Sequence, residues 1–451
     1  MQYNGAALGR ISYMSGRDYY NNFGSGTVSG AWGSLYSGML PDIAAIEAQN
    51  GEDNLLAFHL GISKAMAAHV MMGIVDSVGD IPFSQANNPS EYPSPSVDDD
   101  ADVYAAAVAM LDEAESYLNA AGGGDDLFYG GDSSKWMKFV NTLRMRAMLT
   151  TGDYAGALAQ GGVIDTADAD MQFNYGTQEL QPDTRHPWYQ SDYTTSGANI
   201  YQSNWLMNLM AGDIAEWYGT FGQVAYPGAG NEEAGTAQDV VMSDDPRRRY
   251  YFYRQQWITP GQTGMLYAFD AGPYVWPLSW GGGPADTANG ETLQCSLQLQ
   301  PFHLDFTEDG ADEYGMVGRW CAGHLGYWGR HHGNDEGTPP DNFTRTAVGV
   351  YPAGGSFDNQ PDVPNYDNYG SLSGTNAGIK GAVWQGNGGG GQGIWPIYLS
   401  SYVHFMKAEA AMWLGDVSTA RAMMEIGMQH SFDKVLSMGS VDPDADSNYF
   451  A

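Results

Sequence analysis

The chain has few cysteines and lysines, and it lacks any long apolar run. Cys295 and Cys321 are the only cysteines in 451 residues, and because their spacing matches no metal site, a disulfide and two free thiols both remain open. Six lysines and 13 arginines stand against 38 aspartates and 15 glutamates, which gives a formal net charge of −34. So acidic a chain repels nucleic-acid phosphates and anionic lipids. Without about 18 consecutive apolar residues, we expect no transmembrane helix.

Familiar catalytic motifs are also missing. The sequence holds no Gly-x-Ser-x-Gly, no His-Glu-x-x-His, no phosphate-binding loop and no Cys-x-x-Cys. Gly386, Gly388 and Gly391 fit Gly-x-Gly-x-x-Gly, but their glycine run lacks the strand-to-helix context of a dinucleotide site. Carboxylate pairs suited to glycoside hydrolysis could be drawn anywhere among 53 acidic residues. We therefore expect no catalytic residues.

Two segments contain residue types that bind metals. Three histidines and two acidic residues gather between His324 and Glu336, but their spacing matches no standard zinc site and favours a hydrogen-bonded loop. Asp442-x-Asp444-x-Asp446 resembles the start of a calcium loop, yet it lacks the following glycine and a distal glutamate, which favours a solvated tail. We expect no metal and no cofactor, with calcium as the alternative.

Helical periodicity marks both ends of the chain. Apolar residues recur every three or four positions, and glycines end the segments. The predicted helical faces comprise Leu55, Phe58, Ile62, Met66, Val70 and Ile74; Tyr104, Ala107, Val108, Leu111, Ala114 and Leu118; and Trp136, Val140, Leu143 and Ala147. Further helices are expected over 154–160, 200–210, 398–414 and 417–431.

A short pattern, Gly-Asp-x-x-x-Ala, occurs twice between helices. It runs from Gly152 to Ala157 and from Gly415 to Ala420. The glycine permits a tight turn, the aspartate can cap the next helix, and the alanine allows close helix packing. The repeat indicates helix hairpins of tetratricopeptide type, although two unrelated hairpins would also fit.

The central part of the chain has a different composition. Between residues 164 and 397, Gly, Asp, Tyr, Trp and Pro dominate and helical periodicity is mostly lost. We therefore predict a mainly α protein in which a tetratricopeptide-like scaffold of helix pairs carries a large loop-rich lobe. The scaffold would comprise an N-terminal part, 1–163, and a C-terminal helix pair, 398–451, and the lobe would comprise 164–397.

Aromatic clusters in this lobe indicate a binding surface. Aromatic rings stack on the CH-rich faces of sugars, and neighbouring polar groups hydrogen-bond hydroxyls, although the same residues also bind peptides or pack in cores. The predicted stacking platforms are Trp188, Tyr189, Trp280, Tyr327 and Trp328, with Arg330, His332 and Asn334 as hydrogen-bonding partners.

Five segments in order resemble the SusD/RagB family, and specifically its SusD-like, starch-binding-associated branch. The turn at 76–86 (DSVGDIPFSQA) is similar to the family's YGDIPYSEA, and the helix at 103–118 is similar to IY..I...LDEA...L. Residues 129–146 resemble Y.GD..KW.KFANSLKLRLA, and 401–410 resemble TYAEV.FL.AEA. The loop at 329–341 is similar to the branch's Gly-Arg-x-His-Gly…Pro-Pro-Asp.

The resemblance implies a tetratricopeptide-like fold and a non-enzymatic function. Family members are outer-membrane, surface-exposed nutrient-binding lipoproteins of Bacteroidetes, which deliver glycans to a SusC-like TonB-dependent transporter. It also implies a lipidated cysteine near the N-terminus and a further C-terminal stretch. Neither is found here, so we expect both ends to be clipped.

Four functional hypotheses follow. The first is an oligosaccharide-binding protein, with neutral glycans preferred because of the negative charge. The second is the same fold binding peptides, and the third is a glycoside hydrolase. The fourth is a repeat scaffold that holds partner proteins.

Overall fold

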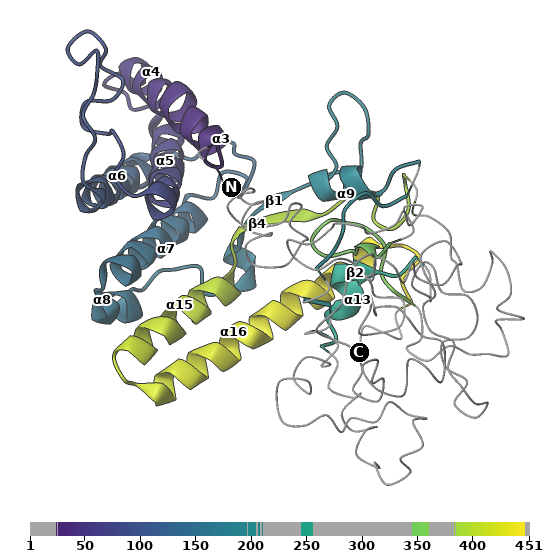
Figure 1. Cartoon of the computed structure of the whole chain (residues 1–451). Helices are drawn as coiled ribbons and strands as arrows, with labels where there is room; N and C mark the ends of the chain where they lie inside the picture. Colours follow the sequence, from purple (N-terminus) through teal and green to yellow (C-terminus); the bar gives the residue numbers. More distant parts are fainter. Residues whose placement is uncertain are drawn as a thin grey trace, which may run out of the picture. The chain divides into compact units, whose positions relative to one another are not determined.

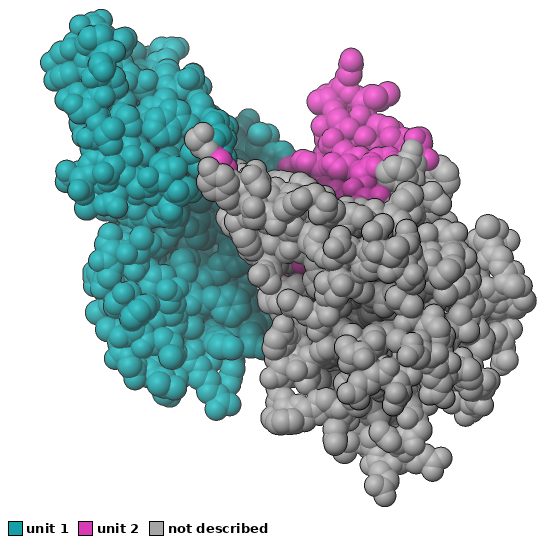
Figure 2. Space-filling view, viewed as in Figure 1, with its two compact units in different colours: residues 1, 25–174, 395–434 teal, residues 2–24, 175–394, 435–451 magenta. Residues whose placement is uncertain are grey.

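The computed structural model describes residues 24, 26–195, 197–203, 206, 207, 210, 245–255, 345–359, 383 and 385–446. The chain divides into two compact units (Figure 2), and the described part is mainly α-helical, as predicted. Unit 1 comprises residues 1, 25–174 and 395–434, and unit 2 comprises residues 2–24, 175–394 and 435–451. Unit 1 extends beyond the expected boundary at 163 because strand β1 (Met171–Asn174) pairs with β4 (Ile394–Tyr398). Residues 435–451, which we predicted in the C-terminal helix pair, belong to unit 2.

Unit 1 is built mainly from helices (Figure 1). It begins with a helical segment interrupted by a π-helical turn, and its helices pack mainly on their neighbours in sequence. The elements are α3 (Ser29–Gly33), the π-helix Ser34–Met39, α4 (Leu40–Asn50), α5 (Ala57–Val78), α6 (Asp100–Ala120), α7 (Ser133–Thr151), α8 (Tyr154–Ala159), α15 (Ser400–Trp413) and α16 (Val417–Ser437).

Helix α5 is the central core helix of unit 1. By length and composition α5 could cross a membrane, but 61% of its most apolar 18-residue window is buried. It contacts α4, α6 and α7, so its burial extends over more than one face and includes Leu60, Ala67 and Met71. The predicted one-sided face is therefore only partly right. Phe58 and Ile74 are buried, whereas Leu55 precedes the helix and is 80% exposed.

Helices α6 and α7 bury the faces that the sequence predicts. Of the six positions predicted for the buried face of α6, five are buried and Val108 is half-buried. All four positions predicted in α7 are buried. Each helix begins at an aspartate: Asp99 accepts a hydrogen bond from the N–H of Ala101, and Asp132 accepts from those of Ser134 and Lys135. The apolar periodicity of the sequence and the capping aspartates therefore indicate the same positions for these two helices.

A partly buried polar cluster joins three of the core helices. Asp76 of α5 accepts hydrogen bonds from the Tyr104 hydroxyl of α6 and from the Arg146 guanidinium of α7. Burial is the largest cause that raises the pKa of Tyr104 to about 12, so this hydroxyl remains a donor at neutral pH. The cluster sets the positions of the three helices relative to one another through side chains on facing surfaces.

Both Gly-Asp turns form the same helix-ending motif, which confirms their predicted roles. Gly152 and Gly415 have φ of 87° and 76°. In each turn the following N–H, of Asp153 or Asp416, donates to the carbonyl five residues earlier. The two aspartates then cap α8 and α16 by accepting from the N–H of Gly156 and Thr419, respectively.

The helices on either side of each turn pack as predicted. Helix α8 contacts both α7 and α15, and Ala157, the alanine of the Gly-Asp-x-x-x-Ala pattern, is 1% exposed. In the second hairpin the rings of His404 and His430 lie 4.8 Å apart, and Gly427 of α16 lies against Phe405 of α15. Figure 1 shows α15 and α16 running side by side in opposite directions. Helix pairs of tetratricopeptide type therefore form the scaffold.

Unit 2 has little regular structure in its described residues. It contains α9 (Pro187–Asp192), α13 (Arg248–Tyr251), the antiparallel pair β2 (Phe252–Tyr253) and β3 (Ala347–Val348), and the 3-10 helix Met438–Val441. Three small apolar clusters hold these elements. They lie around Tyr189 and Tyr193, around Tyr250 and Phe357, and around Met207 and Phe252. Of the helix predicted over 200–210, residues 206, 207 and 210 are helical, residues 200–203 are not, and the others lie outside the described residues.

Replacing Gly152 should reveal the cost of the left-handed turn. In Gly152→Ala we expect the free energy of unfolding to fall by about 1–2 kcal/mol, because a Cβ is unfavourable at φ 87°. Denaturant unfolding followed by circular dichroism measures the change. Gly122→Ala is the matched control, since a Cβ there meets nothing within 4 Å and φ is not in the left-handed region. Equal stability of the two variants would contradict the assigned turn.

Candidate functional site

The structure describes two of the eight predicted site residues, Trp188 and Tyr189, and both lie on α9. The other six, which are Trp280, Tyr327, Trp328, Arg330, His332 and Asn334, lie outside the described residues, as do both cysteines and the histidine cluster at 324–336.

Helix α9 starts at a histidine whose side chain caps it. The His186 Nδ1 accepts a hydrogen bond from the N–H of Trp188, and Pro187 occupies the first turn. Burial lowers the pKa of His186 to about 3, so the ring stays neutral and Nδ1 keeps the lone pair that the cap requires. This cap fixes the start of the helix that carries both described candidates.

Tyr189 is not the open stacking platform that we predicted. It is 0% exposed, and its ring stacks on that of Tyr193 with centroids 4.2 Å apart and planes 13° from parallel. Its hydroxyl donates to the carbonyl oxygen of Asn387 at 2.9 Å and accepts from the N–H of Gly386 at 2.9 Å. Both faces and the polar end of this ring therefore serve the fold. Trp188 is half-buried at the edge of the same cluster, which leaves part of its surface accessible.

The glycine run that Tyr189 contacts is a tightly packed loop. We call residues Gly386–Gly391 the glycine loop. A Cβ on Gly388 would lie 2.2 Å from the carbonyl oxygen of Gly355, and one on Gly391 would lie 2.7 Å from the Cβ of Arg185. Both glycines have positive φ, so their positions need glycine for conformation as well as for space. The run is therefore a loop, as predicted.

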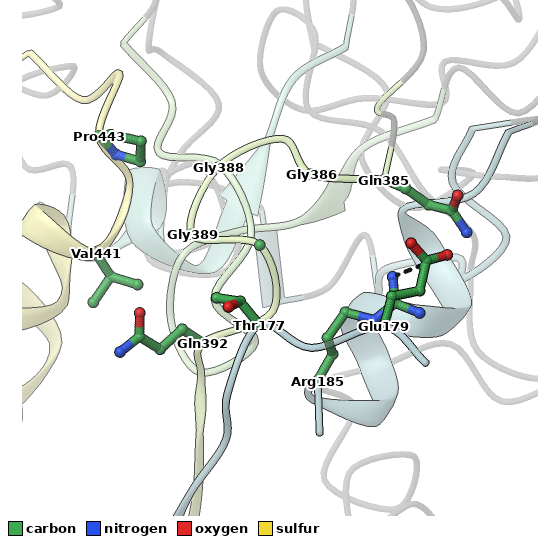
Figure 3. A pocket seen from close by; sticks show the side chains of 11 residues that line it. Thr177, Glu179, Arg185, Gln385, Gly386, Gly388, Gly389, Gln392, Val441 and Pro443 are labelled. Carbon is green, nitrogen blue, oxygen red and sulfur yellow. Dashed lines mark ion pairs between the residues drawn. The ribbon is translucent and has the colours of Figure 1, made fainter. Parts of the chain in front are cut away.

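This loop lines an open pocket of about 510 Å³ in unit 2. Figure 3 shows the lining side chains, with Glu179 and Arg185 facing each other across an ion pair of 3.7 Å. Glutamines flank the glycine loop on both sides, and a third chain segment adds two apolar side chains. The pocket is lined by Thr177, Glu179, Arg185, Gln385, Gly386, Gly388, Gly389, Gly390, Gln392, Val441 and Pro443.

Several peptide N–H groups of the glycine loop already have partners within the protein. Those of Gly386, Gly389, Gly390, Gly391 and Gln392 donate to Tyr189 or to carbonyl oxygens. A phosphate-binding loop instead directs several free N–H groups at its ligand. The hydrogen-bonding capacity of the pocket therefore lies mainly in its side chains.

The one arginine that lines the pocket is paired with two carboxylates. Arg185 donates from Nε and Nη2 to the two carboxylate oxygens of Asp183, at 3.0 and 2.7 Å, and pairs with Glu179. Arg185 holds the pKa of the Asp183 carboxyl below its ordinary value, so this pair stays ionised. Two carboxylates against one guanidinium leave a local charge of about −1, which disfavours anionic ligands.

Sequence reasoning missed the side chains that line this pocket. The signal available was weak: Gln385 and Gln392 flank the glycine run, and Thr177 and Glu179 precede α9 at no motif spacing. Val441 and Pro443 come from the segment in which we predicted a solvated tail. That prediction is wrong at Asp442, which is 4% exposed and accepts hydrogen bonds from the N–H groups of Phe357 and Asp444. This carboxylate ties the segment to unit 2.

Among the described residues, one acidic group has the spacing of a cation site. Asp80, Asp99 and Asp100 have carboxylate oxygens within 4.8 Å of one another, and all three are exposed. Asp99 caps α6 and Asp80 accepts from the N–H of Asp100, so helix capping already accounts for their proximity.

Asp192 is a fully buried carboxylate at the end of α9. Its oxygens accept hydrogen bonds from the N–H groups of Ile200 at 2.8 Å and Val348 at 2.7 Å. Burial raises its pKa to about 7, while these hydrogen bonds and the charge of Arg345 act in the opposite direction. Asp192 thus links two loops. Above neutral pH its carboxylate is charged, and burying this charge away from water costs stability.

The chain is similar to proteins of one family. Residues 3–213 match the SusD-like family model described as "Starch-binding associating with outer membrane". A SusD homolog from Bacteroides vulgatus shares 14% identity, with a TM-score of 0.50 over 100% of this chain and 66% of that protein. A SusD-like protein from Bacteroides thetaiotaomicron shares 16% identity, with a TM-score of 0.51 over 95% and 64%, respectively.

A further solved structure, that of a chitin-binding protein, shares 16% identity, with a TM-score of 0.50 over 98% of this chain and 72% of that one. The chain thus spans just under two thirds of the length of the two Bacteroides proteins. No curated protein matches it significantly.

The buried Asp192 should make stability depend on pH. Because its folded-state pKa lies above the unfolded value near 3.9, the folded state binds the extra proton, and the contribution of Asp192 falls as pH rises from about 4 to 7. We expect the stability difference between the wild type and Asp192→Asn to shrink over this range. Denaturant midpoints at several pH values measure it. A difference that stays constant, or that grows with pH, would show that the carboxyl pKa is not raised.

Proposed function

Because residues 3–213 match the SusD-like family model, we propose that this chain binds neutral oligosaccharides in the pocket beside the glycine loop. It would act at the outer membrane on the cell surface, and it would pass its ligand to a SusC-like TonB-dependent transporter. The observation that carries the proposal is an open pocket of about 510 Å³ on a SusD-like chain, whose lining includes the uncharged hydrogen-bonding side chains of Thr177, Gln385 and Gln392.

The pocket lining suits sugar hydroxyls. Gln385, Gln392 and Thr177 can each both donate and accept, as hydroxyl groups require. Val441 and Pro443 offer apolar contact for the CH face of a ring. Trp188 remains a stacking candidate, and the six residues predicted between Trp280 and Asn334 remain predictions as further ligand contacts.

Binding without catalysis is the function we propose. Glycoside hydrolysis uses two carboxyl groups on either side of the scissile bond. Among the described residues that line the pocket, Glu179 is the only carboxylate, and it is paired with Arg185. The proposal involves no metal and no cofactor.

The family description and the chitin-binding neighbour name the first ligands to test. Isothermal titration should detect maltohexaose, chitohexaose or another neutral oligosaccharide, and Gln392→Ala should weaken binding about fivefold to tenfold, because one or two ligand hydrogen bonds are lost. Gln49→Ala, which removes an exposed glutamine of α4, is the matched control and should leave binding unchanged. Binding to peptides alone would replace this function by peptide capture. Release of shorter sugars from a bound glycan would make the protein a hydrolase.

A glycan array tests the expected preference for uncharged sugars. Arg185 is paired with two carboxylates, that of Glu179 in the pocket lining and that of Asp183 outside the lining. Because this leaves a negative charge beside the pocket, neutral oligosaccharides should bind more strongly than uronic-acid or sulfated counterparts of the same linkage. Preferential binding of the anionic counterparts would contradict the assigned pocket chemistry.

A further inference from the structure

We propose that Tyr189 is a positioning residue, which holds the glycine loop in the conformation that forms the pocket and thereby sets the affinity for the ligand. The part of this inference that concerns affinity rests on the proposed function. The part that concerns the loop stands on the contacts of Tyr189 alone.

The hydroxyl group of Tyr189 clamps one end of the loop. It accepts from the N–H of Gly386 and donates to the carbonyl oxygen of Asn387, so it satisfies two consecutive backbone groups almost 200 residues away in sequence. A hydroxyl can do both at once because it carries a proton and free lone pairs. Since Tyr189 is fully buried, water cannot replace it without a rearrangement of the cluster.

The ring of Tyr189 supports the other end of the loop. A Cβ on Gly391 would lie 2.9 Å from Cδ1 of Tyr189, so the backbone passes directly against the ring. On α9 itself the ring is held by its stacking on Tyr193, whose hydroxyl donates to the carbonyl of Val348 and accepts from the N–H of Ser356. The clamp is therefore itself anchored to a second loop.

The loop needs such a clamp because of its composition. Gly386, Gly388, Gly390 and Gly391 all have positive φ, and glycine has the largest conformational entropy to lose on ordering. The loop lines the pocket directly, and it connects the two flanking glutamines. Fixing it before the ligand arrives reduces the ordering that binding would otherwise require.

Hydrogen exchange tests the clamp without any ligand. Tyr189→Phe keeps the ring and its stacking but removes the hydroxyl, which leaves Gly386 N–H and Asn387 C=O without this partner. We expect amide exchange in peptides covering 385–392 to become about tenfold faster, while unit 1 exchanges as in the wild type. Tyr129→Phe is the matched control, because it removes a hydroxyl that donates to a backbone carbonyl, that of Ala169, within unit 1. Unchanged exchange at 385–392 in Tyr189→Phe would overturn the proposal.

Titration with maltohexaose and chitohexaose tests the consequence for affinity. We expect Tyr189→Phe to bind about threefold to tenfold more weakly than the wild type, and Tyr129→Phe to bind equally well. Gly391→Ala disturbs the same contact from the loop side and should act in the same direction. Faster exchange with unchanged affinity would overturn the role in binding. A wild type that binds neither sugar nor any other glycan would refute the proposed function, while the exchange result would still decide whether Tyr189 holds the loop.

Discussion

Unit 2 depends on hydrogen bonds that buried side chains of one short helix make to distant backbone groups. Backbone N–H and C=O groups must find partners when they are buried, and in most domains helices and sheets supply them. In the described part of unit 2 regular elements are short, and α9 takes over part of this task. Tyr189 bonds the glycine loop, Asp192 bonds Ile200 and Val348, and Tyr193, directly after the helix, bonds Val348 and Ser356. One short helix and the residue that follows it thus organise several loops, because their side chains together reach backbone groups at 200, 348, 356 and 386–387.

In unit 1 the backbone N–H and C=O groups find their partners locally. Its helices satisfy their own backbone groups, so its side chains are free to pack, and the polar cluster at Asp76 adds orientation between helices. The Gly-Asp turns end one helix and begin the next within two residues, which keeps consecutive helices adjacent. The difference in sequence character between the two units therefore reflects two ways of satisfying the backbone.

The same difference explains why aromatic residues in unit 2 are ambiguous in the sequence. A tyrosine combines a large apolar ring with a hydroxyl that both donates and accepts, which suits it equally to binding a sugar and to bonding a buried loop. At position 189 the second use applies, since the ring is covered and the hydroxyl is occupied. Tyr189 consequently meets the pocket only indirectly, through the backbone of the glycine loop that its hydroxyl bonds. The pocket is lined mainly by polar residues and glycines that carry no motif.

The helical scaffold could be predicted from the sequence because its determinants are local. Periodicity placed the buried faces of α6 and α7, and six residues of Gly-Asp-x-x-x-Ala predicted both turns and their caps. The sequence did not predict that α5 is buried on more than one face, because this burial depends on helices from other parts of the chain that pack around it. The pocket was beyond sequence reasoning for the same reason. Its lining comes from three segments, around 177–185, 385–392 and 441–443, and only tertiary contacts bring together residues so far apart. Local periodicity and turn chemistry in the sequence determined the helical scaffold. The burial of Tyr189 and the composition of the pocket were decided by the tertiary structure, because contacts between residues far apart in the chain follow no fixed sequence spacing.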